Sequence, residues 1–149
     1  MVSLQDLPAA IAAYRRAVQA DPTDVRAVAN LGDALMRGGH KQEALQVFVR
    51  AIDLAPRDLI PHYNLARTAL DLNLAELALS AARRANALDK KGYHGSLILA
   101  ESLLAQVAVD APAALASAQL ADQRTSGNAT VRAVLAKAQA ALQQQPPSK

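Results

Sequence analysis

The feature that most constrains the fold of this chain is a spacing of 34 residues, at which small and apolar residues recur. A fixed period of this length is typical of solenoids, in which each repeat is one supersecondary unit that buries its apolar face against its neighbours. The spacing therefore predicts a stack of similar units that works through an extended surface. The recurring sets are Ala10, Ala44 and Ala78; Tyr14, Phe48 and Ala82; Ala17, Ala51 and Ala85; Pro22 and Pro56; and Leu31, Leu65 and Leu99.

Composition indicates that the units are helical. Hydrophobic residues make up 52% of the 149 positions, but alanine supplies much of that share and aromatic residues are only 3%. Alanine is the best helix former, and no β-branched or aromatic runs bounded by turn signals predict strands. Capping residues, glycines and prolines divide the chain into antiparallel helices joined by short turns. The expected helices are 7–20, 25–37, 41–54, 59–71, 75–88 and 129–144, with Asp6, Asp24 (or Thr23) and Asp58 as N-caps and Asn73 in the role of a turn glycine.

Several columns together resemble the tetratricopeptide repeat, which pairs a Leu-Gly and a large residue on its first helix (helix A) with Ala, Phe and Pro on its second (helix B). The first complete unit carries all of these residues, the second keeps most of them, and the third fits only after two residues are inserted around positions 109–112. The resemblance implies an all-α, right-handed α-solenoid of about three and a half repeats plus a C-terminal capping helix. The matching residues of the first unit are Leu31, Gly32, Leu35, Ala44, Phe48, Ala51 and Pro56.

We expect a single domain over residues 1–144. It divides into a half repeat at 7–22 with helix B only, repeats at 25–58 and 59–92, a degenerate repeat at 93–128 and the capping helix at 129–144. Residues 145–149 are expected to form a disordered tail. The missing first helix A indicates a chain cut from a longer array or a helix supplied by something else.

The residue types argue against catalysis and against a metal or cofactor. There is no cysteine, and the three histidines, His40, His62 and His94, lack metal-ligand spacing. Sixteen basic residues face 13 acidic ones, a mildly basic mixed surface that does not predict nucleic-acid binding. No signal peptide or membrane-length apolar run is found, so we expect a cytoplasmic protein.

The resemblance implies that the helix A faces line a concave groove that binds a peptide segment of a partner protein. Asn30 and Asn64 fall on a position that, in related arrays, holds an extended peptide by its backbone. Ala29 and Asp33 stand where the arrays that clamp the C-terminal carboxylates of chaperones need a lysine and an asparagine, so that mode is rejected. The candidate groove residues are Arg26, Asn30, Asp33, Arg37, Tyr63, Asn64, Arg67, His94 and Glu101.

Charge alternates along two groove columns, and two alternative functions stay open. Asp33, Arg67 and Glu101 form one column, Arg37 and Asp71 the next, so we expect ion pairs between neighbouring repeats and a groove without strong net potential. Ile11 and Tyr14 are expected on the open face of the first helix, where they favour a homodimer. The chain could instead be the substrate-recruiting part of a larger enzyme.

Overall fold

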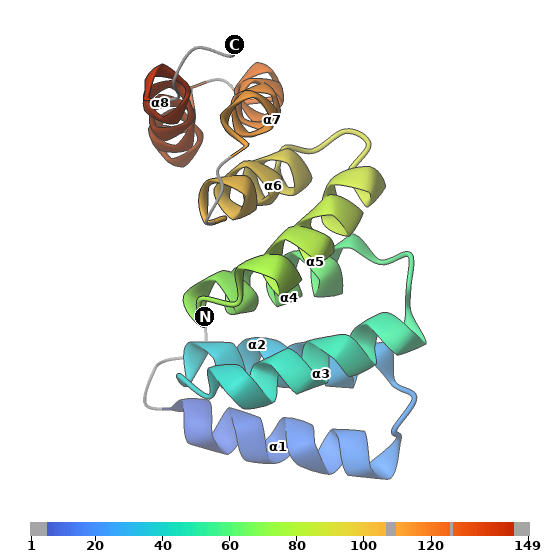
Figure 1. Cartoon of the computed structure of the whole chain (residues 1–149). Helices are drawn as coiled ribbons and strands as arrows, with labels where there is room; N and C mark the ends of the chain where they lie inside the picture. The colour runs from blue at the N-terminus through green and yellow to red at the C-terminus, as the bar shows by residue number, and fades with distance from the viewer. Residues whose placement is uncertain (1–5, 107–109, 126, 145–149) are drawn as a thin grey trace.

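A computed structural model describes residues 6–106, 110–125 and 127–144, which form eight α-helices (Figure 1). Successive helices pack side by side, and the pairs stack from α1 at one end to α7 and α8 at the other. The helices are α1 (Leu7–Ala20), α2 (Val25–Arg37), α3 (Lys41–Leu54), α4 (Leu59–Asp71), α5 (Ala75–Leu88), α6 (His94–Leu104), α7 (Ala111–Gln123) and α8 (Ala129–Gln143).

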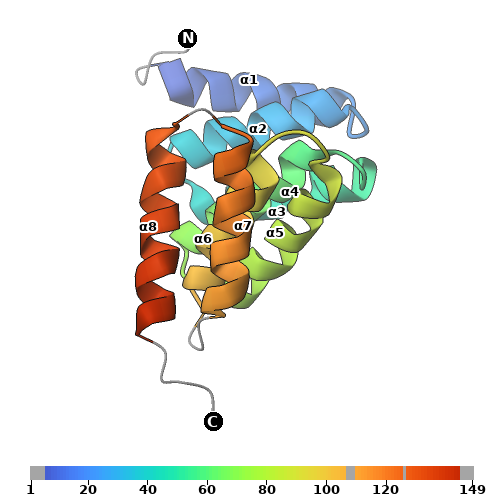
Figure 2. The same ribbon diagram turned by 90° about the horizontal axis from the view of Figure 1, so that it is seen from above.

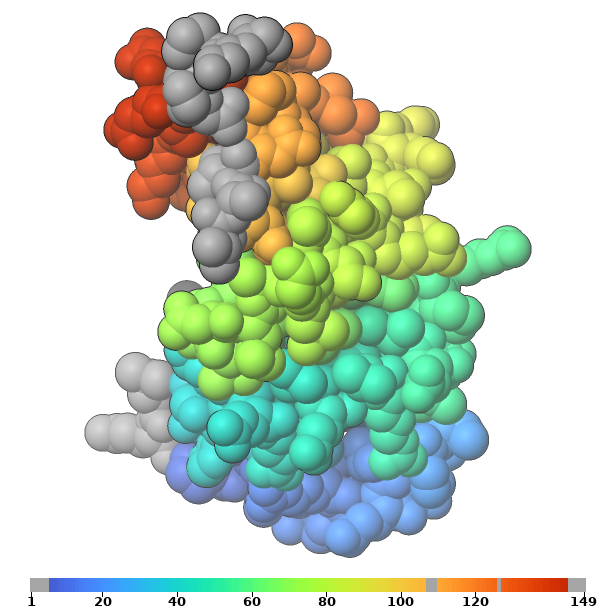
Figure 3. All heavy atoms as spheres, in the orientation of Figure 1, coloured from blue at the N-terminus to red at the C-terminus, as the bar shows by residue number. Residues whose placement is uncertain are grey.

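The stack is the right-handed, all-α solenoid that the sequence predicts. Helices α2, α4, α6 and α8 contact one another in order and form one layer, the helix A layer, while α3, α5 and α7 pack behind it. The view from above shows α8 and α7 lying side by side at the end of the stack (Figure 2). In the space-filling view the units form one continuous column (Figure 3). Five helices, α1 to α5, have the limits that the sequence predicts.

The helix starts follow local chemistry, with one exception. The Asp24 carboxylate accepts hydrogen bonds from the amides of Arg26 and Ala27, and that of Asp58 accepts one from Ile60, as predicted. Asp6 was expected to cap α1 but makes no side-chain capping bond. Its backbone already has helical angles, and the second residue of the helix, Pro8, has no N–H to offer.

Asn73 takes the glycine role predicted for it in the turn between α4 and α5. Its φ of 57° lies in the left-handed region, which asparagine tolerates better than other non-glycine residues. The turn between α2 and α3 has the same geometry at Gly39, with φ 81°. The two corresponding turns therefore share one backbone conformation built from different residues.

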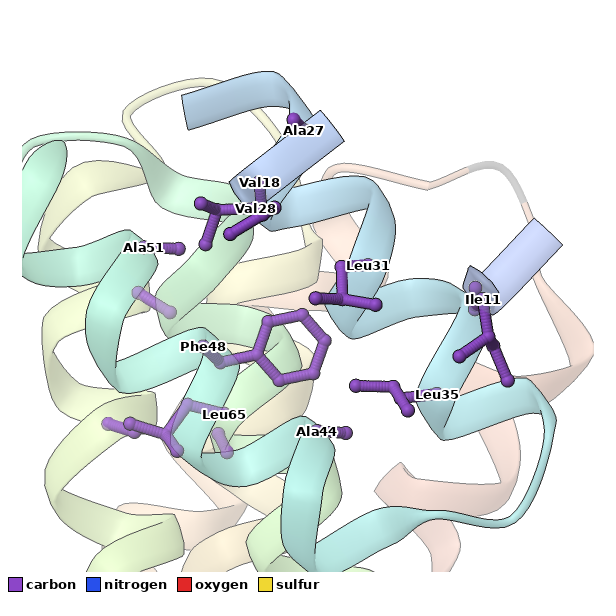
Figure 4. Packing of buried hydrophobic residues seen from close by; sticks show 14 of the residues in the cluster. Ile11, Val18, Ala27, Val28, Leu31, Leu35, Ala44, Phe48, Ala51 and Leu65 are labelled. Atoms are coloured by element: carbon purple, nitrogen blue, oxygen red, sulfur yellow. The ribbon is translucent and has the colours of Figure 1, made fainter. Parts of the chain in front are cut away.

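The core of the first complete repeat centres on Phe48, which is fully buried (Figure 4). Its ring lies beside Leu31 and Leu35 of α2, and the position opposite it on α2 is Gly32. A Cβ atom at Gly32 would lie 2.5 Å from the ring, so the helices can approach this closely only because residue 32 has no side chain.

The same two columns hold smaller helix B residues in the next units. Ala66 and Ala82 occupy them in the second repeat, and Ala100 and Ala118 in the third, and all four are fully buried. A large residue on helix B is thus matched by glycine on helix A, and alanine is matched by alanine. Ala114, Ala118 and Ala121 are all buried as well, in agreement with the two-residue shift predicted for helix B of that repeat. The inserted segment itself lies partly outside the described residues, as does the expected tail 145–149.

Gly32→Ala is expected to lower the free energy of unfolding by about 1–3 kcal/mol through overpacking against Phe48, even though alanine favours the helix by about 1 kcal/mol. Chemical denaturation should show the loss. In a Phe48→Leu background the same substitution should cost much less, because the ring that it strikes is gone. An equal cost in both backgrounds would show that the Gly32–Phe48 contact does not set the effect.

The turn between α5 and α6 is held by a buried acid that the sequence did not single out. The Asp89 carboxylate is 7% exposed by residue and accepts hydrogen bonds from the amides of Gly92 (2.7 Å) and Gly95 (2.9 Å). From α7 the Arg124 guanidinium donates to the carbonyls of Gly92 (2.7 Å) and Asp89 (3.3 Å). This turn therefore connects three successive helices.

Asp89→Ala should destabilise the protein by about 1–3 kcal/mol, because it leaves two amides of the turn without their acceptor. Asp89→Asn keeps one acceptor oxygen and should cost less. Thermal unfolding of both variants checks the order. A loss no larger than that of Asp110→Ala, an exposed cap at the start of α7, would mean that the buried turn contributes nothing beyond an ordinary cap.

The first helix packs differently from the expectation. Ile11 was placed on its open face, but it is 6% exposed and belongs to the core, where its side chain reaches the end of α2 near Gly38. Ile11 lies one residue off the alanine and aromatic columns and so points toward the next unit. Tyr14 is half-buried against the same core. The homodimer stays a prediction, and of the two named residues only Tyr14 remains partly accessible.

Candidate functional site: the groove of the helix A layer

The nine residues predicted to line a groove lie on three helices of one layer, α2, α4 and α6. None of them is buried. The column of Asn30 and Asn64 continues at Ile98 of α6, and that of Tyr63 continues at Leu97. Both of these α6 residues are buried in the core. Of the predicted groove residues, α6 contributes His94, which is exposed, and Glu101, which is half-buried. The nine residues are Arg26, Asn30, Asp33, Arg37, Tyr63, Asn64, Arg67, His94 and Glu101.

Four of these side chains, from α4 and α6, form a connected cluster. Arg67 lies one turn after Tyr63, donates a hydrogen bond of 3.0 Å to its hydroxyl and sits 5.7 Å from its ring centroid. The Tyr63 ring meets His94 of α6 edge to face, with centroids 5.8 Å apart. Arg67 Nη2 is 3.6 Å from Glu101 Oε2. The cluster thus joins two consecutive repeats across the groove.

His94 also stacks on the residue before it. The rings of Tyr93 and His94 are 4.2 Å apart with an interplanar angle of 25°, and the Asn128 side chain donates to the Tyr93 hydroxyl at 3.4 Å. Two of the three tyrosines of the chain, Tyr63 and Tyr93, therefore both contact the His94 ring at one edge of the groove. The sequence placed Tyr63 and His94 in the groove but gave no sign of their contact, which depends on the offset between repeats.

The environment of Arg67 holds it in its charged form. Burial alone would lower its pKa, but the nearby Glu101 carboxylate and the Tyr63 hydroxyl outweigh that effect, and the pKa is raised above its usual value. Because the pKa of Arg67 is raised in the folded state, the stabilisation that this residue contributes is fully present below its unfolded-state pKa. It is lost only as the pH rises through the folded-state pKa. The Arg67 side chain is therefore positively charged throughout the physiological pH range.

The alternating columns give one bridge between neighbouring repeats in the way predicted, Arg67 with Glu101. Asp33 pairs with Arg37 on its own helix at 3.7 Å. Asp71 pairs with Lys41, at the start of α3, at 3.2 Å. Lys41 was not in either column, and it lies near Asp71 because α3 packs against α4 in the opposite direction, with the start of α3 beside the end of α4.

Two groove asparagines face solvent with their amides unused. Asn30 is exposed and Asn64 half-buried, one repeat apart on α2 and α4. Within the described part of the chain neither side-chain amide has a hydrogen-bond partner. Each side-chain amide can donate and accept hydrogen bonds, and so can the backbone of a bound peptide.

His62, in the column where the repeat often has tryptophan, is a packing residue. It is 7% exposed, and its Nε2 lies 3.1 Å from the Pro56 carbonyl oxygen. Across the described residues no group of three or more potential metal ligands comes together. In the same residues no helix is long and apolar enough to cross a membrane.

The sequence analysis missed a hollow of ≈ 400 Å³ at the end of the groove, between α4, α6 and α8. Its apolar lining includes Leu70, Leu104 and Val134, and Lys137 of α8 lies at its edge. The sequence did hold a signal for Lys137. Once the two-residue insertion is carried into the last helix, it follows Glu101 in the alternating column.

Comparisons with known proteins agree with this geometry. The family model described as tetratricopeptide repeat matches residues 2–58. Over residues 2–58 the chain thus matches the tetratricopeptide repeat family, and the 34-residue spacing and the stacked helix pairs extend the same pattern into the other described repeats. A search of curated protein sequences gives no significant match.

Solved structures share the fold at low identity. MamA (residues 41 to the end) from Desulfovibrio magneticus RS-1 superposes with a TM-score of 0.82 at 16% identity, over 92% of this chain and 76% of that one. YrrB, described as a TPR protein with an unusual peptide-binding site, gives 0.79 at 19% identity, over 95% and 72%. The first TPR of Spaghetti (RPAP3), solved with the HSP90 peptide SRMEEVD, gives 0.75 at 18% identity, over 83% and 97%.

The bridge between repeats can be tested by a double-mutant cycle on Arg67→Gln and Glu101→Gln. The two side chains are 36% and 21% exposed, so solvent screens the pair and the coupling energy should be about 0.5–1 kcal/mol. It should shrink at high salt and stay constant across neutral and mildly alkaline pH. The more exposed pair of Asp33 and Arg37, measured in the same way, should couple less. Equal coupling for the two pairs would contradict a special role for the bridge.

Proposed function

We propose that the chain is a protein-interaction module that binds an extended segment of a partner protein along the groove of α2, α4 and α6. The observation that carries the proposal is the pair of solvent-facing amides, Asn30 and Asn64, on consecutive helices of the groove layer. Helices of one layer lie about 8–10 Å apart, which an extended peptide spans with about three residues. Two amides at that separation suit alternate backbone groups of one bound strand.

The rest of the groove suits a peptide whose charge is balanced. Arg67 is engaged by Glu101, and Asp71 by Lys41, so the walls offer few uncompensated charges in the middle of the groove. Tyr63 and His94 add an aromatic edge that can pack against a peptide side chain. Asp33 disfavours an acidic C-terminal tail held at the first complete repeat. The peptide-binding site named for YrrB and the peptide bound to Spaghetti support peptide binding as a use of this fold, without supplying the partner.

The non-catalytic role and the cytoplasmic location expected from the sequence stay expectations. Binding through the groove does not depend on either of them. A chain that recruits a substrate for a larger enzyme would use the same surface.

The double variant Asn30→Ala/Asn64→Ala should weaken binding of a natural partner by about 1–3 kcal/mol, since each lost hydrogen bond costs on the order of 1 kcal/mol. Helical content by circular dichroism should not change, because neither amide bonds within the described structure. A partner captured from cell extract and then titrated as a purified protein provides the measurement.

The matched control is Gln42→Ala/Gln46→Ala, which removes two exposed amides from α3 in the other layer. This variant should bind as the unmodified protein does. Undiminished binding by the asparagine variant, or an equal loss in the control, would contradict the groove mechanism.

A further inference from the structure

The hollow at the end of the groove has the size of a side-chain binding site. Its volume of ≈ 400 Å³ lies near the lower end of the range for ligand pockets, about 300–1,000 Å³. Leu70, Leu104 and Val134 give it an apolar floor from three different helices of one layer. Such a floor favours an apolar side chain over a polar one.

Within the described residues, one charged side chain at its rim has no ion-pair partner. Four charged residues line the hollow, and three of them are compensated: Arg67 and Glu101 by each other at 3.6 Å, and Asp71 by Lys41 at 3.2 Å. Lys137 has no ion pair within the part of the chain that the structure describes. It follows Val134 by three residues on α8, so both side chains lie on one face of that helix.

The wall of the hollow also contains polar atoms that the chain does not satisfy. Arg67 Nε and Glu101 Oε2 are buried and have no hydrogen-bond partner. Buried polar atoms in native proteins are almost always bonded. Both atoms belong to the Arg67–Glu101 ion pair at 3.6 Å, so this pair is held by charge and not by a hydrogen bond.

We propose that the hollow binds an apolar side chain of the partner peptide and that Lys137 binds the carboxylate of the adjacent acidic residue. The inference rests on the proposed function and adds the chemistry that this end of the groove selects. A basic residue at the second position of the peptide would be repelled by the unpaired ammonium group of Lys137. The nearby carboxylates of Asp71 and Glu101 already have partners. The site lies on α8 and on the last turns of α4 and α6, away from Ala29 and Asp33, where a C-terminal carboxylate clamp would require other residues.

The test uses three capped peptides, acetyl-Gly-Leu-Asp-Gly-amide and its Leu-Asn and Leu-Lys counterparts, titrated into the whole chain. Methyl NMR signals of Leu70, Leu104 and Val134 report on the hollow. We expect the Leu-Asp peptide to bind about 2–5-fold more tightly than Leu-Asn, with Leu-Lys weakest, as for an exposed ion pair. The preference should fall as salt is added, because the pair is screened.

Lys137→Glu should reverse the order, so that the Leu-Lys peptide binds most tightly. Arg132→Glu is the matched control, since it reverses one charge on the same helix at a residue that does not line the hollow, and it should leave the order unchanged. An unchanged order in Lys137→Glu, a reversal in both variants, or no shift of the three methyl signals would overturn the inference.

Failure of the proposed function gives a different result. The Asn30→Ala/Asn64→Ala variant should keep the peptide order at the hollow, whatever it does to the natural partner. If the three peptides do not bind in the expected order but the asparagine substitutions still weaken partner binding, only the proposal for the hollow is contradicted. If the peptides bind in the expected order but the asparagine substitutions do not weaken partner binding, only the proposal that the groove binds a peptide backbone is contradicted.

Discussion

The close contact between Gly32 and Phe48 is the constraint on which the first complete repeat depends. An aromatic ring can be fully buried between two antiparallel helices only where one helix presents bare backbone to it. This contact fixes the distance between α2 and α3. The neighbouring units solve the same problem with alanine on both sides, which keeps the columns packed with less bulk. The two columns therefore stay closely packed although their summed side-chain volume differs between repeats.

Much of the fold could be predicted from the sequence because its signals are local. Asp24, Asp58 and Asn73 set helix ends through backbone groups two or three residues away, and such effects can be read from neighbouring letters. Asp6 failed as a cap because its backbone already has helical angles, and Pro8 lacks one of the two amides that a capping side chain can accept from. Ile11 was misplaced because one step of sequence, or about 100° around a helix, separates the open face from the core face.

The groove was predictable in outline and in one of its contacts. Repeat columns identify which residues share a face, so none of the nine candidates proved to be buried. The columns predicted the bridge between Arg67 and Glu101. They do not give the offset between helices, which leaves Asp33 paired with Arg37 and brings Asp71 to Lys41. The Asp89 turn and the burial of Ile98 likewise depend on packing across repeats.

The open end of the stack has a consequence for how the protein loses its structure. Among the described helices, α1 packs closely against α2 alone. One exposed ion pair, Arg15 with Glu43 at 2.7 Å, also connects it to α3. Inner helices have neighbours on both sides. In a linear array each unit is stabilised by its own folding and by its nearest interfaces, so opening begins where an interface is missing. We therefore expect the amides of α1 to exchange with solvent faster than those of α4 and α5, which have neighbours on both sides. The molecule thus carries a gradient of local stability along its axis.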